Sequence, residues 1–423
     1  MIITPQRVRD VDTAMIAPPS KSFTHRALIA GALAEGKTEI LKPLDSDDTR
    51  LTAAALKALG VNVKESPGRI VVDGCDGDIP NTGVTALDLQ NSGTSLRLLA
   101  SLAMLCRYPV ILSGNARMDE RPIAPLAKAL RELGGSVDFL RNAGYPPIRV
   151  SGNLTGGRVT IDGSVSSQFI SSVLMAAPYA TRDVEVIIPS PPASASYLDI
   201  TTDVIQAFSG RVIRNGYERF LVSRKNRYRG RLYTIEGDYS SASYFFAIAA
   251  VCGGRVTVGN LLPRTKQGDR RFLDALAEMG CTVLYCSRSV TVKRDGDLHG
   301  ITIDMATSPD TVQTLCMVAA MAQTPTTITG ISHLKFKESD RITGTAERLR
   351  LLGGDVSVGD DWITIRPAPL HGGTIDPADD HRTAMSFTVL GLGIGGVTVS
   401  NAECVNKSFP AFWDVLRKAG VLT

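Results

Sequence analysis

Basic and hydrogen-bonding residues recur in this 423-residue sequence just before a series of apolar segments. They are Lys21, Arg26, Asn91, Gly93, Arg97, Ser166, Gln168, His381 and Arg382, with Asp238 and Asp310 at two equivalent positions. Connecting segments add Arg121 in DERPIAPL, Lys337, Glu338 and Arg341 in FKESDRI, and Lys407 in NKSFP. Clustered cations and donors bind multiply charged anions. The carboxylates Asp310 and Glu338 would have no role in simple anion binding, which indicates chemistry on small anionic substrates.

Lys337 and Arg341 are four residues apart, so on a helix the two cations would repel each other unless an anion lay between them. The alternative is a solvated helix start, where Glu338 and Asp340 balance the charge. Other candidates also have structural explanations. Asp310 could be a plain N-cap, Arg97 could support the loop around Asn91, and His381 could be a structural hydrogen-bonding residue.

Six segments that must position these residues share one form, a polar lead-in, a Ser or Thr, and an apolar helix of small residues. The six anchors are spaced 70 to 74 residues apart: Ser22, Thr94, Ser167, Ser241, Thr311 and Thr383. We expect the anchors to be N-caps. An amphipathic helix ending on glycine follows each apolar helix, and β-rich segments such as VNVKES follow the first five pairs. The sixth unit has no such segment, so we expect MIITPQ at the N-terminus to complete it.

A helix that is apolar on all faces is buried, whereas an amphipathic helix is half exposed. The pattern therefore predicts two α/β domains of three units each, with apolar helices inside and sheets outside. We expect residues 1–19 and 236–423 to form one discontinuous domain and residues 20–235 the other, with the active site in the cleft between them. Six helix N-termini at that cleft would attract anions.

Residues 31–38, GALAEGKT, match the Walker A pattern G-x-x-x-x-G-K-[ST]. A P-loop requires a strand before the glycine loop and a helix after it. Here the apolar helix RALIAGALA precedes Gly36, and TEIL after it is typical of a strand. We therefore predict that Gly36 ends a helix, that Lys37 is exposed and that no nucleotide binds.

Composition indicates a globular, cytoplasmic protein. Hydrophobic residues make up 43% of the chain, and 46 Lys and Arg against 42 Asp and Glu leave a net charge of +4, too balanced for a general nucleic-acid binder. The seven cysteines form no CxxC pair, which argues against a disulfide framework or a zinc site. The segment MIITPQRVRD has no secretory signal, and no apolar run is long enough to span a membrane.

Eight motifs occur in the order and spacing of one family: PPSKSFTHR, LQNSGTSLR, DERPIAPL, DGSVSSQF, EGDYSSASYF, KESDR, DDHRTAM and NKSFP. In these motifs the whole chain resembles the 5-enolpyruvylshikimate-3-phosphate (EPSP) synthase family. The resemblance implies an inside-out α/β fold of two domains, each of three βαβαββ units. It implies a cytoplasmic, monomeric transferase (EC 2.5.1.19) of the shikimate pathway, in aromatic amino acid and chorismate biosynthesis. The enolpyruvyl group of phosphoenolpyruvate would pass to the 5-hydroxyl of shikimate 3-phosphate through a tetrahedral intermediate, without cofactor or metal.

The resemblance also assigns residues. Phosphoenolpyruvate would be bound by Lys21, Gly93, Arg121, Gln168, Arg341, Arg382 and Lys407. Shikimate 3-phosphate would be bound by Lys21, Ser22, Arg26, Thr94, Ser166, Ser167, Gln168, Ser194, Tyr197, Asp310, His333 and Lys337. Asp310 would take the proton of the 5-hydroxyl, Glu338 would protonate the methylene carbon, and Lys337 and Lys21 would complete the catalytic set. Glyphosate would compete with phosphoenolpyruvate beside Gly93.

The sequence departs from the family pattern at two positions. His333 stands where many members have Asn or Arg, and Leu98 stands where many have proline. Two rival functions stay open. One is the sister enolpyruvyl transferase that acts on UDP-N-acetylglucosamine, although its usual reactive cysteine is missing from the loop SGNARMDERP. The other is a non-catalytic anion-binding scaffold.

Overall fold

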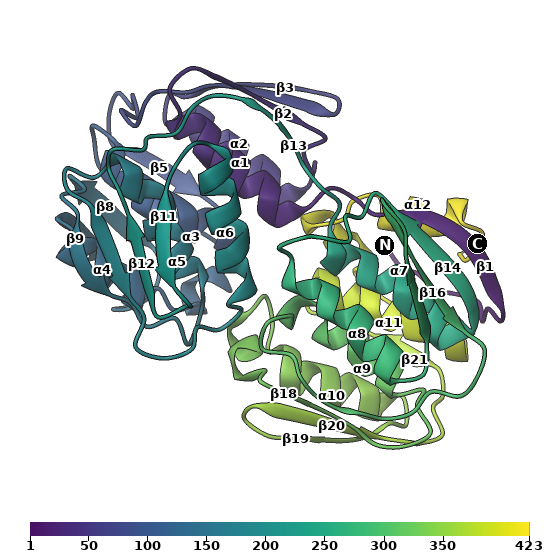
Figure 1. Cartoon of the computed structure of the whole chain (residues 1–423). Coiled ribbons are helices and arrows are strands. Elements are labelled where there is room, and N and C mark those ends of the chain that lie inside the picture. Colours follow the sequence, from purple (N-terminus) through teal and green to yellow (C-terminus); the bar gives the residue numbers. More distant parts are fainter. Residues whose placement is uncertain (423) are drawn as a thin grey trace. The chain divides into compact units, whose positions relative to one another are not determined.

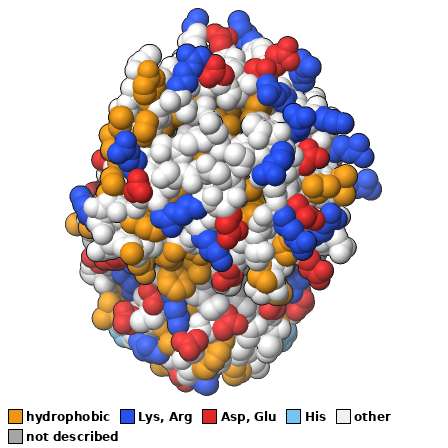
Figure 2. Space-filling model, turned by 90° about the vertical axis from the view of Figure 1, so that its left-hand side faces the viewer, with side chains coloured by type: hydrophobic (Ala, Val, Ile, Leu, Met, Phe, Trp, Pro, Cys, Tyr) orange, Lys and Arg blue, Asp and Glu red, His pale blue; other side chains and the backbone are white. Residues whose placement is uncertain are grey.

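The computed structural model describes residues 1–422, which divide into two compact units (Figure 1). Unit 1 consists of Met1–Pro18 and the chain from Glu236 onward, and unit 2 is Pro19–Ile235. No helix within residues 1–422 is both long and apolar enough to span a membrane. Lys and Arg side chains alternate with Asp and Glu over the face drawn in Figure 2, in keeping with the balanced net charge.

Unit 2 repeats one supersecondary pattern three times. Its helices are α1 (Lys21–Leu33), α2 (Asp47–Ala58), α3 (Gly93–Leu102), α4 (Ala124–Glu132), α5 (Gln168–Ala176) and α6 (Ser196–Ala207). Its strands are β2 (Lys37–Leu41), β3 (Asn62–Ser66), β4 (Arg69–Asp73), β5 (Thr85–Asp88), β6 (Val110–Ser113), β7 (Gly135–Phe139), β8 (Ile148–Gly152), β9 (Gly157–Thr160), β10 (Val184–Ile187), β11 (Val212–Asn215), β12 (Arg219–Val222) and β13 (Leu232–Thr234). The three sheets have the orders β13-β2-β4-β3, β5-β6-β8-β7 and β9-β10-β12-β11. Each contains one parallel pair and two antiparallel pairs.

Unit 1 follows the same plan. Its helices are α7 (Tyr239–Cys252), α8 (Arg271–Glu278), α9 (Val312–Ala319), α10 (Arg341–Leu351), α11 (His381–Ile394) and α12 (Phe412–Lys418). Its strands are β1 (Val11–Ile16), β14 (Gly254–Gly259), β15 (Thr282–Tyr285), β16 (Ser289–Arg294), β17 (Thr302–Asp304), β18 (Thr326–Thr329), β19 (Asp355–Val358), β20 (Trp362–Arg366), β21 (Gly373–Ile375) and β22 (Val397–Val399). Two sheets, β1-β14-β16-β15 and β17-β18-β20-β19, match those of unit 2, and the third is the pair β21-β22. Ile3 bridges Val399 of β22, so the N-terminal segment joins the sixth unit as predicted.

The apolar helices form the core of each unit. All residues of α7 are buried, and α7, α9 and α11 pack on one another in unit 1, as α3 does on α5 in unit 2. The strands alternate buried and partly exposed residues, so each sheet has one face toward this core and one toward solvent. The predicted fold class, an inside-out α/β fold with buried apolar helices and outer sheets, is confirmed.

The Walker-type segment has the reversed order that the sequence predicted. Helix α1 ends at Leu33, Gly36 has a φ of +86°, and β2 begins at Lys37. Glycine adopts this left-handed conformation without the steric cost that a Cβ would add. The Lys37 side chain is 69% exposed and 3.9 Å from Asp73.

The prediction that all six anchors are N-caps is wrong for four of them. Only Ser167 and Thr311 occupy that position, whereas Ser22 and Thr94 are the second residue of their helices and Ser241 and Thr383 the third. The N-caps of these four helices are Ser20, Ser92, Asp238 and Asp380. Asp238 and Asp380 cap α7 and α11 with their side chains, whereas Ser20 and Ser92 make no side-chain cap.

Candidate active site

The apolar helices of unit 2 begin without side-chain caps. Ser20, Ser92 and Ser167 are the N-caps of α1, α3 and α5, and none of these three described residues caps its helix with its hydroxyl. The N–H groups of a first helical turn have no partner within the helix, and the helix dipole makes this end positive. Three such ends in one unit favour the binding of anions.

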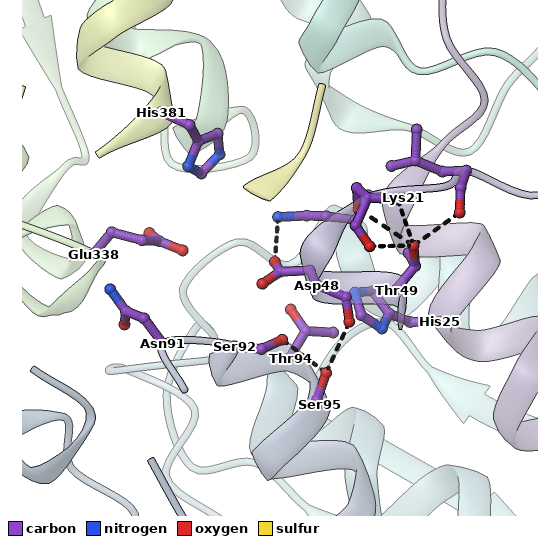
Figure 3. Close-up of polar contacts among 12 residues, drawn as sticks. Lys21, His25, Asp48, Thr49, Asn91, Ser92, Thr94, Ser95, Glu338 and His381 are labelled. Atoms are coloured by element: carbon purple, nitrogen blue, oxygen red, sulfur yellow. Dashed lines mark hydrogen bonds and ion pairs between the residues drawn. The ribbon is translucent and has the colours of Figure 1, made fainter. Parts of the chain in front are cut away.

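Lys21, the first residue of α1, is held by a carboxylate. Its ammonium donates to Asp48 Oδ2 at 2.9 Å, and the Asp48 side chain is only 4% exposed (Figure 3). Asp48 lies in the first turn of α2 and was not among the predicted site residues. Its buried carboxylate fixes the position of the Lys21 ammonium.

Arg121 and Gly93 lie against each other. The guanidinium of Arg121 is buried and donates to the backbone oxygen and the Oδ1 of Asn91, at 3.2 and 3.1 Å. A Cβ added at Gly93 would lie 2.7 Å from Nη2 of Arg121 and 2.8 Å from Cζ. Any residue other than glycine at position 93 would therefore displace the guanidinium of Arg121.

Gln168, the first residue of α5, links two neighbouring helices. Its Oε1 accepts from Arg97 at 2.8 Å and its Nε2 donates to Thr94 Oγ1 at 2.9 Å. Arg97 also reaches Ser166 Oγ at 3.4 Å and lies over the Phe169 ring. Arg97 therefore orients Gln168 and Ser166, a different role from the support of the Asn91 loop considered above.

Arg26 is a buried cation with neutral partners only. Its side chain donates to Thr201 Oγ1 at 2.8 Å and to the Ser22 carbonyl at 3.0 Å, with longer bonds to Ser171 and the Tyr197 carbonyl. Burial lowers the pKa of Arg26 to about 10. A buried charge is costly unless it is compensated, and no described carboxylate compensates this one. A bound anion would do so.

Ser194, just before α6, has a strained backbone and a buried hydroxyl. Its φ is +56°, a region that non-glycine residues rarely adopt, and its Oγ makes no hydrogen bond with the described chain. Tyr197 is partly buried in α6, and Ser167 is buried at the start of α5. The predicted anion ligands of unit 2 are thus mostly buried polar groups, as a preformed site requires.

Unit 1 gathers carboxylates around two arginines. Arg341 donates to Asp380 at 2.8 Å, to Glu338 Oε2 at 2.8 Å and to Asp310 Oδ1 at 3.2 Å. Arg382 donates to Asp310 Oδ2 at 2.7 Å and to the Asp310 carbonyl at 3.0 Å. Burial alone would lower the pKa of Arg341, but the three carboxylates outweigh it and raise that pKa above its usual value.

The sequence analysis did not single out Asp380. Its side chain is fully buried, caps α11 through Arg382 N–H at 3.0 Å and accepts from Ser339 Oγ at 2.9 Å. Burial raises the pKa of Asp380, but Arg341 and His381 outweigh burial and lower it below the usual range. Asp48 and Asp380 share a signal that could have revealed them. Each is the second residue of an Asp-Asp pair, at or next to the start of a helix.

The helical argument for Lys337 and Arg341 is wrong. Asp340 is the N-cap of α10, its Oδ1 accepting from the N–H groups of Ile342 and Thr343, and Arg341 is the first helical residue. Lys337 precedes the helix in an extended conformation, so the two cations are not neighbours on one helical face. Glu338 and Asp380 neutralise Arg341 instead.

Of the remaining predicted residues of unit 1, His333, Asp310 and Lys407 lie in short 3-10 segments, whereas His381 begins α11. His333 lies in η6 (Ser332–Phe336), and burial, followed by the charge of Lys337, lowers its pKa to about 3. His333 is therefore neutral at neutral pH, and its Nε2 is buried without a hydrogen-bond partner among the described residues. Lys407 ends η7 (Ala402–Lys407) and is partly buried. His381 is buried, with Nδ1 3.8 Å from Asp380 Oδ1. Asp310 lies in η5 (Pro309–Thr311) and is not an N-cap.

Replacement of Asp380 by Asn should destabilise unit 1 by about 3 kcal/mol or more, because it removes the most buried partner of Arg341. The folded-state pKa of Asp380 is lowered, so its contribution is present above the unfolded pKa of about 4 and is lost as pH falls through the folded pKa. Urea unfolding at pH 7 and pH 3 measures this. The difference in free energy of unfolding between wild type and Asp380→Asn should be smaller at pH 3 than at pH 7. An equal difference at both pH values would contradict a lowered pKa of Asp380 in the folded state.

Unit 2 thus brings together Lys21, Ser22, Arg26, Gly93, Thr94, Arg121, Ser166, Ser167, Gln168, Ser194 and Tyr197 on the starts of its apolar helices and nearby turns. Unit 1 brings together Asp310, His333, Lys337, Glu338, Arg341, Arg382 and Lys407. One set is rich in anion-binding groups and the other combines cations with carboxylates.

Comparison with known proteins identifies the family. The chain belongs to the EPSP synthase (3-phosphoshikimate 1-carboxyvinyltransferase) family, whose model matches residues 5–416. It is 60% identical to the 3-phosphoshikimate 1-carboxyvinyltransferase of Methanoregula boonei over 99% of both chains. It is also 60% identical to that of Methanoculleus marisnigri over the full length of both. The structure of EPSP synthase from Acinetobacter baumannii superposes with a TM-score of 0.82 at 27% identity, covering 100% of this chain and 98% of that one.

Proposed function

We propose that this enzyme transfers the enolpyruvyl group of phosphoenolpyruvate to the 5-hydroxyl of shikimate 3-phosphate and releases phosphate. The observation that carries the proposal is the family match over residues 5–416, joined by high identity to named 3-phosphoshikimate 1-carboxyvinyltransferases. Both substrates are small and multiply anionic. Buried cations and uncapped helix ends on unit 2 are the groups that such substrates need.

In the binding step, Lys21, Arg121, Gln168 and Lys407 hold the phosphate of phosphoenolpyruvate, with Gly93 beside it. Shikimate 3-phosphate is bound by Ser22, Arg26, Thr94, Ser166, Ser167, Ser194, Tyr197, His333 and Lys337. The planar forks of Arg341 and Arg382 suit the two oxygens of the phosphoenolpyruvate carboxylate. Support for these roles comes from the partners that fix Lys21, Arg121 and Gln168 and from the burial of eight of these groups: Arg26, Arg121, Ser166, Ser167, Ser194, His333, Arg341 and Arg382.

In the chemical step, Asp310 takes the proton of the 5-hydroxyl as its oxygen attacks C2 of phosphoenolpyruvate, and Glu338 gives a proton to the methylene carbon. The tetrahedral intermediate then loses a proton from the new methyl group and expels phosphate, so general acid and general base act at different points. Arg341, 2.8 Å from Glu338, favours the charged carboxylate, which cannot donate a proton. A substrate carboxylate that engages Arg341 would weaken this pair and favour protonation of Glu338.

An assay of phosphate release with each substrate omitted in turn tests the proposal. Release should require both phosphoenolpyruvate and shikimate 3-phosphate, and should need neither added metal nor nucleotide. Release with a UDP-amino sugar in place of shikimate 3-phosphate would favour the sister transferase. Tight binding of both substrates without any release would favour a non-catalytic scaffold.

Lys37→Ala should leave the rate of this reaction within about twofold, because an exposed lysine away from the predicted site contributes little. The same phosphate-release assay measures it. Loss of activity in a variant that folds normally would reinstate nucleotide binding at GALAEGKT.

We further propose that the enzyme works as a monomer in the cytoplasm. This rests on the class of metabolic enzyme to which its family belongs. Sedimentation equilibrium should give the mass of one chain, 45.1 kDa, and a concentration-dependent rise toward twice that mass would contradict it.

Gly93→Ala should raise the inhibition constant of glyphosate, a phosphonate-carboxylate that can use the phosphoenolpyruvate cations. The first atoms that the new Cβ meets belong to Arg121, so the KM for phosphoenolpyruvate should rise as well, but by a smaller factor. The reason is steric, because the longer ligand tolerates a displaced guanidinium and a new methyl group less well than the compact substrate. Steady-state kinetics with varied inhibitor give both constants. An equal rise of the inhibition constant and of the KM for phosphoenolpyruvate would contradict this steric explanation. A wild-type enzyme that millimolar glyphosate does not inhibit would contradict it as well.

A further inference from the structure

A chain of buried hydroxyl groups lies beneath the starts of three helices of unit 2. His25 Nδ1 is hydrogen-bonded to Thr52 Oγ1 at 2.8 Å, and Thr52 Oγ1 to Ser95 Oγ at 2.8 Å. Ser95 Oγ is also bonded to Ser92 Oγ at 2.7 Å and donates to the Asp48 carbonyl at 3.3 Å. These four side chains, which we call the hydroxyl chain, are at most 1% exposed. They join α1, α2 and α3 at their first two turns, and Figure 3 shows His25, Ser92 and Ser95.

The hydroxyl chain contacts Asp48, which pairs with Lys21, and includes Ser92, which precedes Gly93. Asp48, whose backbone oxygen it holds, carries the carboxylate that fixes Lys21. Ser92, at its other end, is the N-cap of α3 and immediately precedes Gly93. The Ser92 hydroxyl bonds Ser95 Oγ and does not cap α3, which leaves the first N–H groups of that helix to other acceptors.

Each hydroxyl of the chain has a single hydrogen to donate. If Ser95 donates to the Asp48 carbonyl, it must accept from both Thr52 and Ser92, and His25 then donates from Nδ1 to Thr52. Each of the four side chains then donates one hydrogen bond, and the donors lead through Ser95 to the Asp48 carbonyl. Such a network specifies one arrangement of the three helices, whereas an apolar contact would permit small shifts.

We propose that His25, Thr52 and Ser95 are positioning residues that set the geometry of Lys21 and of the Gly93 turn for the phosphate of phosphoenolpyruvate. This rests on the function proposed above. The three residues act through Asp48 and Ser92 and touch no substrate. Loss of the Thr52 hydroxyl removes its bonds to His25 Nδ1 and Ser95 Oγ, which link α1 to α3 through α2, so the first turns of α1 and α3 shift relative to each other.

Thr52→Val tests this proposal, because valine keeps the shape of threonine and removes the hydroxyl. The KM for phosphoenolpyruvate should rise about fivefold or more, while kcat and the KM for shikimate 3-phosphate stay within about twofold. Thr52→Ser restores the hydroxyl and should return the KM toward the wild-type value.

Ser101→Ala is the matched control. Ser101 Oγ is bonded to Ser172 Oγ at 2.6 Å, equally buried, on the same helix α3 but farther from its start. Its replacement should lower the melting temperature as Thr52→Val does, with the KM for phosphoenolpyruvate unchanged. Three results would overturn the positioning role. The KM for phosphoenolpyruvate could change equally in Thr52→Val and Ser101→Ala, or equally in Thr52→Val and Thr52→Ser. In Thr52→Val, the KM values for phosphoenolpyruvate and shikimate 3-phosphate could also rise in parallel.

Calorimetric titration with inorganic phosphate gives a second readout that needs no turnover. Thr52→Val should bind phosphate about fivefold more weakly than wild type, and Ser101→Ala should bind it equally well. Wild-type phosphate binding without turnover would contradict the proposed function but leave this inference standing. Normal turnover with unchanged phosphate affinity in Thr52→Val would overturn the inference alone.

Discussion

Glu338→Gln should lower kcat by about 10²–10⁴-fold, because a positioned proton donor to carbon contributes a factor of that order. The KM values of both substrates should change little. Glutamine keeps the size of the side chain and can still accept the hydrogen bond that Arg341 donates to Oε2 at 2.8 Å, so the cluster of unit 1 should remain intact. Steady-state kinetics measure the rate, and calorimetry measures substrate binding.

Glu347→Gln is the matched control for that experiment, since Glu347 is an exposed carboxylate on α10, the helix that Arg341 begins. Its kcat should equal that of the wild type. A near-normal kcat in Glu338→Gln would remove Glu338 from the proton-transfer role. A large loss of kcat in a Glu338→Gln variant that is also unfolded would instead show that Glu338 stabilises the cluster around Arg341.

Arg121→Ala should raise the KM for phosphoenolpyruvate by about two orders of magnitude, because it removes a buried, charge-assisted donor to the substrate phosphate. The loss of a charged hydrogen bond of about 1.5–3 kcal/mol corresponds to roughly 10- to 150-fold. Arg121→Ala also removes the hydrogen bonds to the backbone oxygen and Oδ1 of Asn91, which stabilise the turn before Gly93. Initial rates at varied phosphoenolpyruvate measure the effect.

Two further variants separate charge from geometry at this position. Arg121→Lys keeps the charge but lacks the planar fork that reaches Asn91, so it should recover only part of the affinity. Arg117→Ala removes a nearby arginine that pairs with the exposed Glu120 at 2.7 Å, and it should leave the KM unchanged. A KM for phosphoenolpyruvate in Arg121→Ala within twofold of wild type would contradict the phosphate-binding role.

The six-fold repeat made the fold predictable from sequence. Apolar and amphipathic helices alternate with strands at a fixed interval, and burial sorts them into a core and a surface. The N-cap positions were not predictable to the residue, because Ser20, Ser92, Asp238 and Asp380 compete with the anchors for that role. Local sequence alone does not decide which of several adjacent Ser or Asp residues begins a helix.

The cations of the site and the carboxylates Asp310 and Glu338 were visible in sequence, whereas Asp48 and Asp380 were not singled out. Lys21 and Asp48 are 27 residues apart, and Arg341 and Asp380 are 39 apart. An Asp-Asp pair marks each of these two carboxylates, but the cation that each one binds is set by the packing of separate helices. The hydroxyl chain from His25 to Ser92 was missed for the same reason, since its members are common residues that become informative only when buried together.

Deuterium incorporation from solvent is the sharpest test of the addition-elimination mechanism. If enolpyruvyl transfer proceeds by addition and elimination, the methylene carbon of phosphoenolpyruvate becomes a methyl group in the intermediate. Turnover in D₂O should therefore place deuterium in the vinyl group of the product, as mass spectrometry can measure, and Glu338→Gln should lose product formation and incorporation together. Product formed by the wild-type enzyme at normal rate without deuterium would contradict the tetrahedral intermediate and the role of Glu338.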